Sequence, residues 1–133
     1  MTDQHLSILF QLLILFQVKH FLADFPLQTN YMLFRKTNPG WDFVLPLLSH
    51  CLVHSVLTLI IVLIYIPSLW WLGPLDLVLH FIMDRFKSSP KWLGRYNDLG
   101  KAHFWWALGF DQMFHHITHL LIIWFMIIKI MEG

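Results

Sequence analysis

The feature that most constrains this chain is a set of long apolar stretches whose polar residues are mainly His and Asp, spaced four apart. The clearest stretch runs from Phe104 to Met131, long enough to cross a ~30 Å hydrocarbon core. It carries Asp111, His115 and His119, which on a helix share one face with a drift of about 40° per step. Ionisable groups at such depth are costly and usually functional. The stretch therefore predicts a membrane helix that directs three polar side chains toward partners on other helices.

The composition supports a membrane protein with a single domain over residues 1–133. Hydrophobic residues make up 57% and charged residues 13%, a balance typical of membrane proteins. The net charge of +1 argues against a nucleic-acid partner, which would select a basic stripe or tail. The single cysteine, Cys51, excludes an internal disulfide and a cysteine-based zinc site. Because the N-terminus lacks a basic region and a small-residue cleavage site, the first apolar stretch is expected to be retained.

Four apolar segments predict an all-α fold, a four-helix transmembrane bundle with a buried His/Asp cluster. The segments cover about residues 6–25, 44–69, 75–86 and 104–131. Residues 27–43 form a polar connection between the first two. Residues 88–103 predict a short amphipathic helix in the membrane interface, because apolar side chains recur at helical spacing after Ser89 and Pro90. A solvated basic loop is the alternative for this segment.

The distribution of basic residues predicts how the chain crosses the membrane. With four spans, residues 27–43 and 87–103 lie on one side, and both termini lie on the other. The first side, with the end of the third segment, carries seven Lys and Arg residues, and the second carries only Lys129. Since cytoplasmic loops are enriched in Lys and Arg, we expect these connections in the cytoplasm and both termini outside.

All four segments carry His or Asp residues four apart, and these fall at the cytoplasmic end of each helix. A rise of ~1.5 Å per residue sorts them into an outer layer, a layer one turn deeper and an inner layer. The outer layer contains Asp24, His50, Asp84 and Asp111; the middle layer contains His20, His54, His80 and His115; the inner layer contains Asp76 and His119.

Six histidines and four aspartates in one membrane core predict a site for two or three divalent metal ions. Unpaired carboxylates there would be costly, and imidazole and carboxylate both bind Zn²⁺, Mn²⁺ and Fe²⁺. The share of histidine favours zinc over manganese or iron, because di-iron bundles use more glutamate and the only glutamate here is Glu132. Some of the residues would orient a ligand rather than bind. The alternative for each histidine alone is an interhelical hydrogen bond.

Other polar residues near the cluster are expected to lie outside the metal site. Lys19 is expected to extend toward the interface, with contact to an anionic ligand as the alternative. Cys51 is expected in the apolar core. Thr58, Gln112 and Thr118 are expected to satisfy neighbouring polar groups, and His5, His103 and His116 to stay outside the site.

Three stretches of the chain resemble a family of small bacterial and phage membrane proteins catalogued as a domain of unknown function. They are QVKHFLADFPLQTNYM, LVLHFIMDRFK and FWWALGFDQMFHHITHL. The resemblance covers nearly the whole chain and implies a multi-pass protein of the bacterial inner (cytoplasmic) membrane.

More loosely, the spacing of His20 and Asp24 resembles zinc ligation in the phospholipase C and P1-nuclease class, whose soluble helical enzymes hold three zinc ions and hydrolyse phosphodiesters. That class also uses a terminal amino group and a glutamate as ligands, which have no evident counterpart here. Families of membrane-bound metal-dependent hydrolases have comparable spans with His and Asp.

These observations predict a membrane-embedded metal-dependent hydrolase that acts on a phosphoester of a lipid or lipid-linked substrate. Bound metals lower the pKa of water from about 15.7 to about 7 and clamp the attacking and leaving oxygens. One of Asp24, Asp84 and Asp111 would be the general base. The residues expected to meet a headgroup phosphate are Arg35, Lys36, Arg85 and Lys87.

A transporter or channel for divalent metal ions or protons is the second prediction. It would need polar groups that continue to the outer face, whereas Leu6–Phe16, Leu59–Ile64 and Leu120–Ile128 are nearly unbroken apolar runs, unless the protein forms an oligomer. A bis-histidine haem protein is the third. It would use His54 and His115 but would leave the aspartates unexplained.

Overall fold

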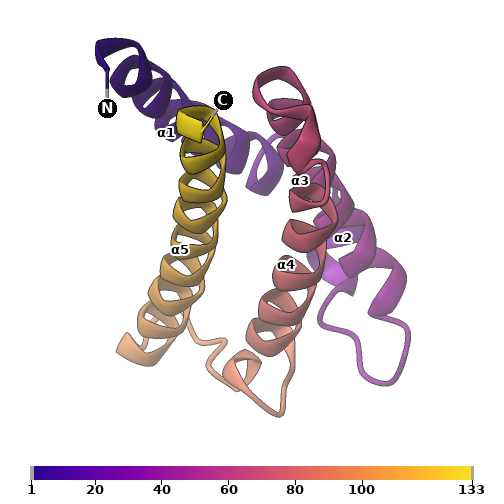
Figure 1. The fold of residues 1–133 in the computed structure, drawn as a ribbon. Coiled ribbons are helices and arrows are strands. Elements are labelled where there is room, and N and C mark those ends of the chain that lie inside the picture. Colours follow the sequence, from indigo (N-terminus) through magenta and orange to yellow (C-terminus); the bar gives the residue numbers. More distant parts are fainter. Residues whose placement is uncertain (1, 133) are drawn as a thin grey trace.

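The computed structural model describes residues 2–132, and this range contains helices without strands (Figure 1). Four helices are long: α1 (Asp3–Asp24), α3 (Val44–Tyr65), α4 (Leu72–Ser88) and α5 (Ala102–Glu132). Three elements are short: α2 (Asn30–Arg35) and the 3₁₀ turns η1 (Pro67–Leu69) and η2 (Leu93–Arg95). The all-α prediction is confirmed, and each apolar segment predicted as a span overlaps one long helix.

Three of the helices in residues 2–132 are long and apolar enough to cross a membrane, namely α1, α3 and α5. Helix α4 has 17 residues, which extend about 26 Å at ~1.5 Å per residue, a little less than a typical hydrocarbon core. The three apolar helices are therefore typical of a membrane protein, and a shorter fourth helix lies beside them.

Each long helix packs against two others: α1 packs against α3 and α5, and α4 also packs against α3 and α5. Both termini and the short α3–α4 connection lie at one end of the molecule, here called the terminal end (Figure 1). The connections α1–α3 and α4–α5 lie at the other, here called the loop end. Each helix therefore runs from one end to the other.

The terminal half of the molecule has an apolar core. Its fully or almost fully buried side chains come from all four long helices: Leu12 and Phe16, Val62, Leu72, and Ile122 and Met126. In a membrane such side chains contribute by close packing rather than by leaving water. This core fills the space between the helices on the terminal side of the polar half.

The two connections at the loop end differ from what the sequence predicts. The first contains α2, whose start is stabilised by the Thr29 side chain accepting a hydrogen bond from the Met32 backbone N–H. Residues 88–103 do not form the predicted amphipathic helix; between the end of α4 at Ser88 and the start of α5 at Ala102, the chain makes the single turn η2 and is otherwise irregular. The segment instead folds back on the end of α4. The Gly94 N–H donates to the Ser89 carbonyl oxygen at 3.0 Å, and Gly94 lies so close to α4 that an added Cβ would be 2.5 Å from the Ser88 carbonyl oxygen.

Candidate metal centre

The ten His and Asp residues meet in one cluster in the loop half of the molecule. Nine of them are buried, and Asp24 is partly exposed. The spacing of four explains the arrangement, because such residues project from one helix face, and all four long helices turn that face inward. Whether these residues bind metal stays a prediction; their proximity is an observation.

In the outer layer, two histidines lie between carboxylates. His50 Nε2 is 3.5 Å from Asp24 Oδ1 and 3.3 Å from Asp84 Oδ2. His115 Nε2 is 3.1 Å from Asp84 Oδ1 and 3.2 Å from Asp111 Oδ1. Asp84 therefore joins α3 to α5 through both of its oxygens.

The middle layer consists of four imidazole rings. The His80 ring centroid is 3.8 Å from that of His54 and 3.9 Å from that of His115. The His20 ring completes the layer at 5.6 Å from His54 and 5.8 Å from His115. Protonated rings at these distances would repel one another, whereas neutral imidazoles side by side can share metal ions.

The inner layer contains a residue that was predicted to point elsewhere. Lys19 does not extend to the interface; it is 3% exposed, and its Nζ donates to Asp76 Oδ2 at 2.9 Å and to His119 Nε2 at 3.1 Å. The Thr58 hydroxyl donates to the same Asp76 oxygen at 2.6 Å. The other oxygen of Asp76 is 3.4 Å from His80 Nδ1. The expected extension of Lys19 to the interface is therefore wrong, and its partner is the Asp76 carboxylate of the protein itself; contact with an anionic ligand stays a prediction.

The position of Lys19 in α1 explains this correction. The buried residues of α1 include Leu12, Phe16, Lys19 and Ala23, which recur at helical spacing on the face that meets the other helices. Lys19 is thus on the core face, where a partner of opposite charge is required. The sequence contained this signal, because Lys19 lies three residues after Phe16.

Six buried atoms of the cluster make no hydrogen bond among residues 2–132, although two of them, Asp84 Oδ2 and Asp111 Oδ1, lie 3.3 Å and 3.2 Å from a histidine Nε2. The six atoms are His20 Nδ1, His54 Nδ1, His80 Nε2, Asp84 Oδ2, Asp111 Oδ1 and His119 Nδ1. Buried polar atoms nearly always have a partner, and these atoms are imidazole nitrogens and carboxylate oxygens, the donor atoms that divalent cations take. These atoms are therefore free to bind a divalent cation.

Four groups of three residues have ligand atoms within 4.8 Å of one another. They are His20, His54 and His80; Asp24, His50 and His54; Asp76, His80 and His119; and His80, Asp84 and His115. Ligand atoms on one zinc ion lie roughly 3–4 Å apart, given zinc–ligand distances of ~2.0–2.2 Å. Each group thus needs only small side-chain movements to hold an ion.

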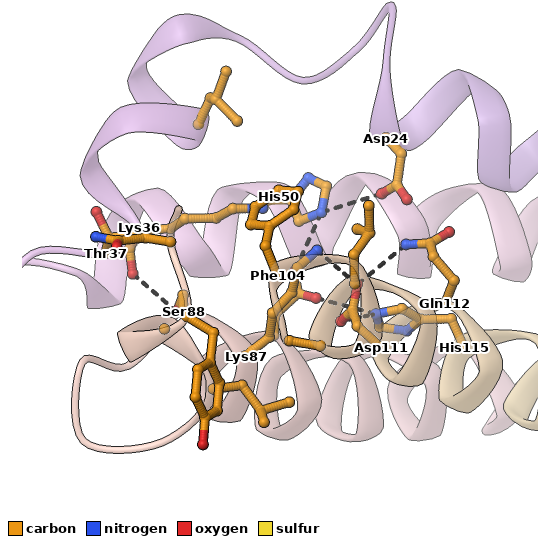
Figure 2. Close-up of a pocket in the computed structure, with 18 of the residues that line it drawn as sticks. Asp24, Lys36, Thr37, His50, Lys87, Ser88, Phe104, Asp111, Gln112 and His115 are labelled. Atoms are coloured by element: carbon orange, nitrogen blue, oxygen red, sulfur yellow. Dashed lines mark hydrogen bonds and ion pairs between the residues drawn. The ribbon is translucent and has the colours of Figure 1, made fainter. Parts of the chain in front are cut away.

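A cavity of about 910 Å³ leads from the loop end to this cluster (Figure 2). The cluster residues that line it are Asp24, His50, Asp84, Asp111 and His115. Basic side chains on its wall are Lys36, Lys87 and Arg95, and apolar side chains include Phe25, Leu33, Leu93, Phe104 and Leu108. The cavity wall thus combines acidic, imidazole, basic and apolar groups, and one of the basic groups, Lys87, contacts Asp111 of the cluster.

The basic residues predicted to meet a substrate fall into two sets. Lys36 and Lys87 line the cavity, and Lys87 Nζ donates to Asp111 Oδ2 at 2.6 Å. The guanidinium of Arg85 instead lies 3.4 Å from the Phe43 ring centroid, and that of Arg35 lies 5.6 Å from the ring of Tyr31. The structure therefore does not bring the two arginines into the cavity.

Sequence reasoning missed Arg95 as a cavity residue. It lies in the segment that was predicted to be an interfacial helix, and the fold of η2 against α4 turns this segment over the cavity. Arg95 is one of several basic residues in 88–103. Because this segment was predicted to be an interfacial helix, the Arg95 side chain was expected at the membrane surface and not in the cavity.

The neighbouring polar residues behave as the sequence predicts. Gln112 Oε1 lies 2.9 Å from His20 Nε2, and its Nε2 donates to Asp111 Oδ2 at 3.1 Å. Cys51 is fully buried in a small apolar core beside α4. His116 lies at the edge of the cluster, with its ring centroid 5.2 Å from that of His20 and its Nδ1 3.3 Å from Gln17 Nε2, and it belongs to none of the four ligand groups.

Comparison with known proteins identifies a family whose description names no activity. The model of a family described as "Protein of unknown function (DUF3307)" matches residues 12–132. This range contains the whole cluster and every residue that lines the cavity. No curated protein and no solved structure matches the chain. The match confirms the resemblance to a family catalogued as a domain of unknown function, whereas the likeness to metal-dependent hydrolases stays a prediction.

Proposed function

Since the chain belongs to the DUF3307 family, whose description names no activity, we propose its function from the chemistry of the site. The protein is a membrane-embedded metal-dependent hydrolase of phosphoesters in lipids or lipid-linked compounds. The observation that carries this proposal is the cavity of about 910 Å³ that ends on the His/Asp cluster, with an apolar core behind the cluster.

In this proposal α4 completes a four-helix transmembrane bundle in the bacterial inner membrane. Helix α4 is short for a span, but it packs against both α3 and α5, which shield its Asp76, His80 and Asp84 from lipid. Seven basic residues at the loop end, against Lys129 at the terminal end, support a cytoplasmic loop end and outside termini.

The cofactors in this proposal are two or three divalent metal ions, with zinc favoured by six histidines in the cluster. The six buried donor atoms that make no hydrogen bond in residues 2–132 and the four ligand groups support it. The ions would supply the activated water and neutralise charge on a phosphoester. Zinc also suits hydrolysis because the reaction needs no change of oxidation state and zinc has no redox chemistry.

The chain's own residues then divide the remaining work. Lys36, Lys87 and Arg95 on the cavity wall would attract and hold a phosphate, while the apolar wall would accept the hydrocarbon part of a lipid. Asp111 belongs to none of the four ligand groups, and it holds Lys87 on one oxygen and faces His115 with the other. We assign Asp111 the role of general base, and Asp24 and Asp84 the role of metal ligands.

The apolar core favours an enzyme over a transporter or channel. A path across the membrane needs polar groups or water along its length, but the side chains behind the cluster are Leu12, Phe16, Val62, Leu72 and Met126, all fully buried. A cavity lined only by residues of the loop half suits a substrate that enters and leaves by the same side.

The test uses full-length protein purified in detergent with zinc. It is incubated with phosphatidic acid, phosphodiester lipids and a polyprenyl phosphate, and released phosphate or headgroup is measured. Hydrolysis that stops with a chelator and returns with zinc is expected. In parallel, proteoliposomes are tested for zinc uptake. Zinc flux without hydrolysis of any of these substrates would overturn the hydrolase and favour the transporter.

A further inference from the structure

Lys19 and its partners form a part of the cluster that the proposed hydrolysis does not use. The Lys19 amine lies between Asp76 and His119, within 2.9 Å and 3.1 Å of their ligand atoms. It is as deeply buried as the histidines around it. Asp76 Oδ2 also accepts from Thr58, so this oxygen already has two donors.

The overlap of the four ligand groups limits how many ions fit. His54 belongs to two groups and His80 to three. If no residue is shared, two groups at most can be filled, and Asp24–His50–His54 must be one of them. The other is either His80–Asp84–His115 or Asp76–His80–His119. Only the first choice leaves the partners of Lys19 undisturbed.

We infer that Lys19 takes the place of a metal ion in the inner group Asp76–His80–His119 and that the centre is binuclear. One ion is held by Asp24, His50 and His54, and the other by His80, Asp84 and His115. The inference rests on the proposed function for the existence of a metal centre, and adds its ion number and ligands.

The inner layer also positions His80. Its Nδ1 faces Asp76 Oδ1 at 3.4 Å, and its Nε2 is buried without a partner in residues 2–132. A carboxylate that accepts from one imidazole nitrogen fixes the tautomer and leaves the other nitrogen for the metal. Lys19 and Thr58 in turn hold Asp76, so Lys19 is a positioning residue for His80 as well as a built-in cation.

The first experiment measures zinc bound per chain in detergent-purified protein by elemental analysis. Wild type is expected to hold two equivalents, His119→Ala to keep two, and His115→Ala to hold fewer. Circular dichroism and gel filtration show which variants fold. Three equivalents in wild type, or the loss of one in His119→Ala, would overturn the binuclear centre and leave the hydrolase standing. No zinc in folded wild type would overturn both.

The second experiment asks whether Lys19 keeps zinc out of the inner group Asp76–His80–His119. Lys19→Met approximately keeps the length of the side chain and removes the amine, so it frees Asp76 and His119. Because His80 can serve only one of the two groups that contain it, the change is made in His115→Ala, in which the group His80–Asp84–His115 is incomplete. Equilibrium dialysis against free zinc is expected to give one more equivalent for Lys19→Met combined with His115→Ala than for His115→Ala alone. Equal zinc content in the two folded proteins would contradict the role of Lys19. If the variant does not fold, the comparison of His119→Ala with His115→Ala decides the ion number.

Discussion

At the scale of single residues, the carboxylates proposed as metal ligands differ in their contacts from the one proposed as general base. Asp84 faces His50 and His115 with its two oxygens, while Asp111 faces Lys87 and His115. Of the two carboxylates, Asp84 belongs to a ligand group and Asp111 does not. Substitution of Asp84 is therefore expected to lower the metal content, whereas substitution of Asp111 is expected to lower catalysis alone.

Asp111→Asn tests this distinction. The change keeps the volume of the side chain but removes the charge that would accept a proton, and general base catalysis contributes about 10²–10⁴-fold. We expect kcat to fall within that range while zinc content stays at the wild-type value. The matched control is Asp42→Asn, on the exposed first connection, which should change neither. Loss of zinc in Asp111→Asn would make Asp111 a ligand instead.

Arg95→Ala tests the basic wall of the cavity. A hydrogen bond to a charged group contributes about 1.5–3 kcal/mol, so removal of the guanidinium should raise KM for an anionic lipid by about tenfold or more, with zinc content unchanged. Arg35→Ala is the control, because its guanidinium lies beside Tyr31. Equal changes in KM for the two variants would show that the cavity wall is not the phosphate site.

At the scale of secondary structure, the sequence predicts long elements better than short ones. The apolar segments locate all four long helices, because sustained hydrophobicity over many residues is a strong signal. The helix predicted for residues 88–103 was wrong, because the fold of this segment depends on the close approach of Gly94 to Ser88, which a local sequence pattern does not show. For the same reason Arg95 was missed, and Arg85 was expected in the cavity although Phe43 holds it elsewhere.

The His/Asp positions were predictable because spacing and depth along a helix are both readable from sequence. The spacing of four gives the face, and the rise of ~1.5 Å per residue gives the layer. What spacing alone does not give is which groups pair. The contact of Lys19 with Asp76 joins α1 to α4, and it depends on how the helices pack.

Gly94→Ala tests the close approach of the 88–103 connection to α4. An added Cβ would lie 2.5 Å from the Ser88 carbonyl oxygen, so the connection must shift, and strain of this kind costs typically about 1–3 kcal/mol. We expect a lower thermal unfolding midpoint and a higher KM. Gly109→Ala is the control, because nothing lies within 4 Å of its added Cβ and alanine favours the helix. An unchanged midpoint and KM in Gly94→Ala would show that the connection is not held there.

At the scale of the whole molecule, the two halves have different tasks. The terminal half is an apolar core, and the loop half contains the cluster, the cavity and most of the basic residues outside the cluster. This division predicts a site that is reached from one side of the membrane only.

Cysteine labelling tests that side. Asp3→Cys and Arg95→Cys are introduced separately after Cys51→Ala, since Cys51 is buried and its removal eliminates background. An impermeant thiol reagent added to intact cells should label position 3 and leave position 95 unlabelled until the cells are broken. The reverse pattern would put the cavity mouth outside.

Metal content decides whether the cluster is a metal centre at all. Full-length protein is purified with zinc supplementation, and bound zinc is compared among wild type, His54→Ala, His115→Ala and His116→Ala. His115 and His116 are neighbours in α5, but only His115 belongs to a ligand group. We expect two equivalents in wild type and in His116→Ala, and fewer in the other two variants. Wild-type protein that is fully folded and holds no divalent metal, or the same content in all four proteins, would contradict the metal centre.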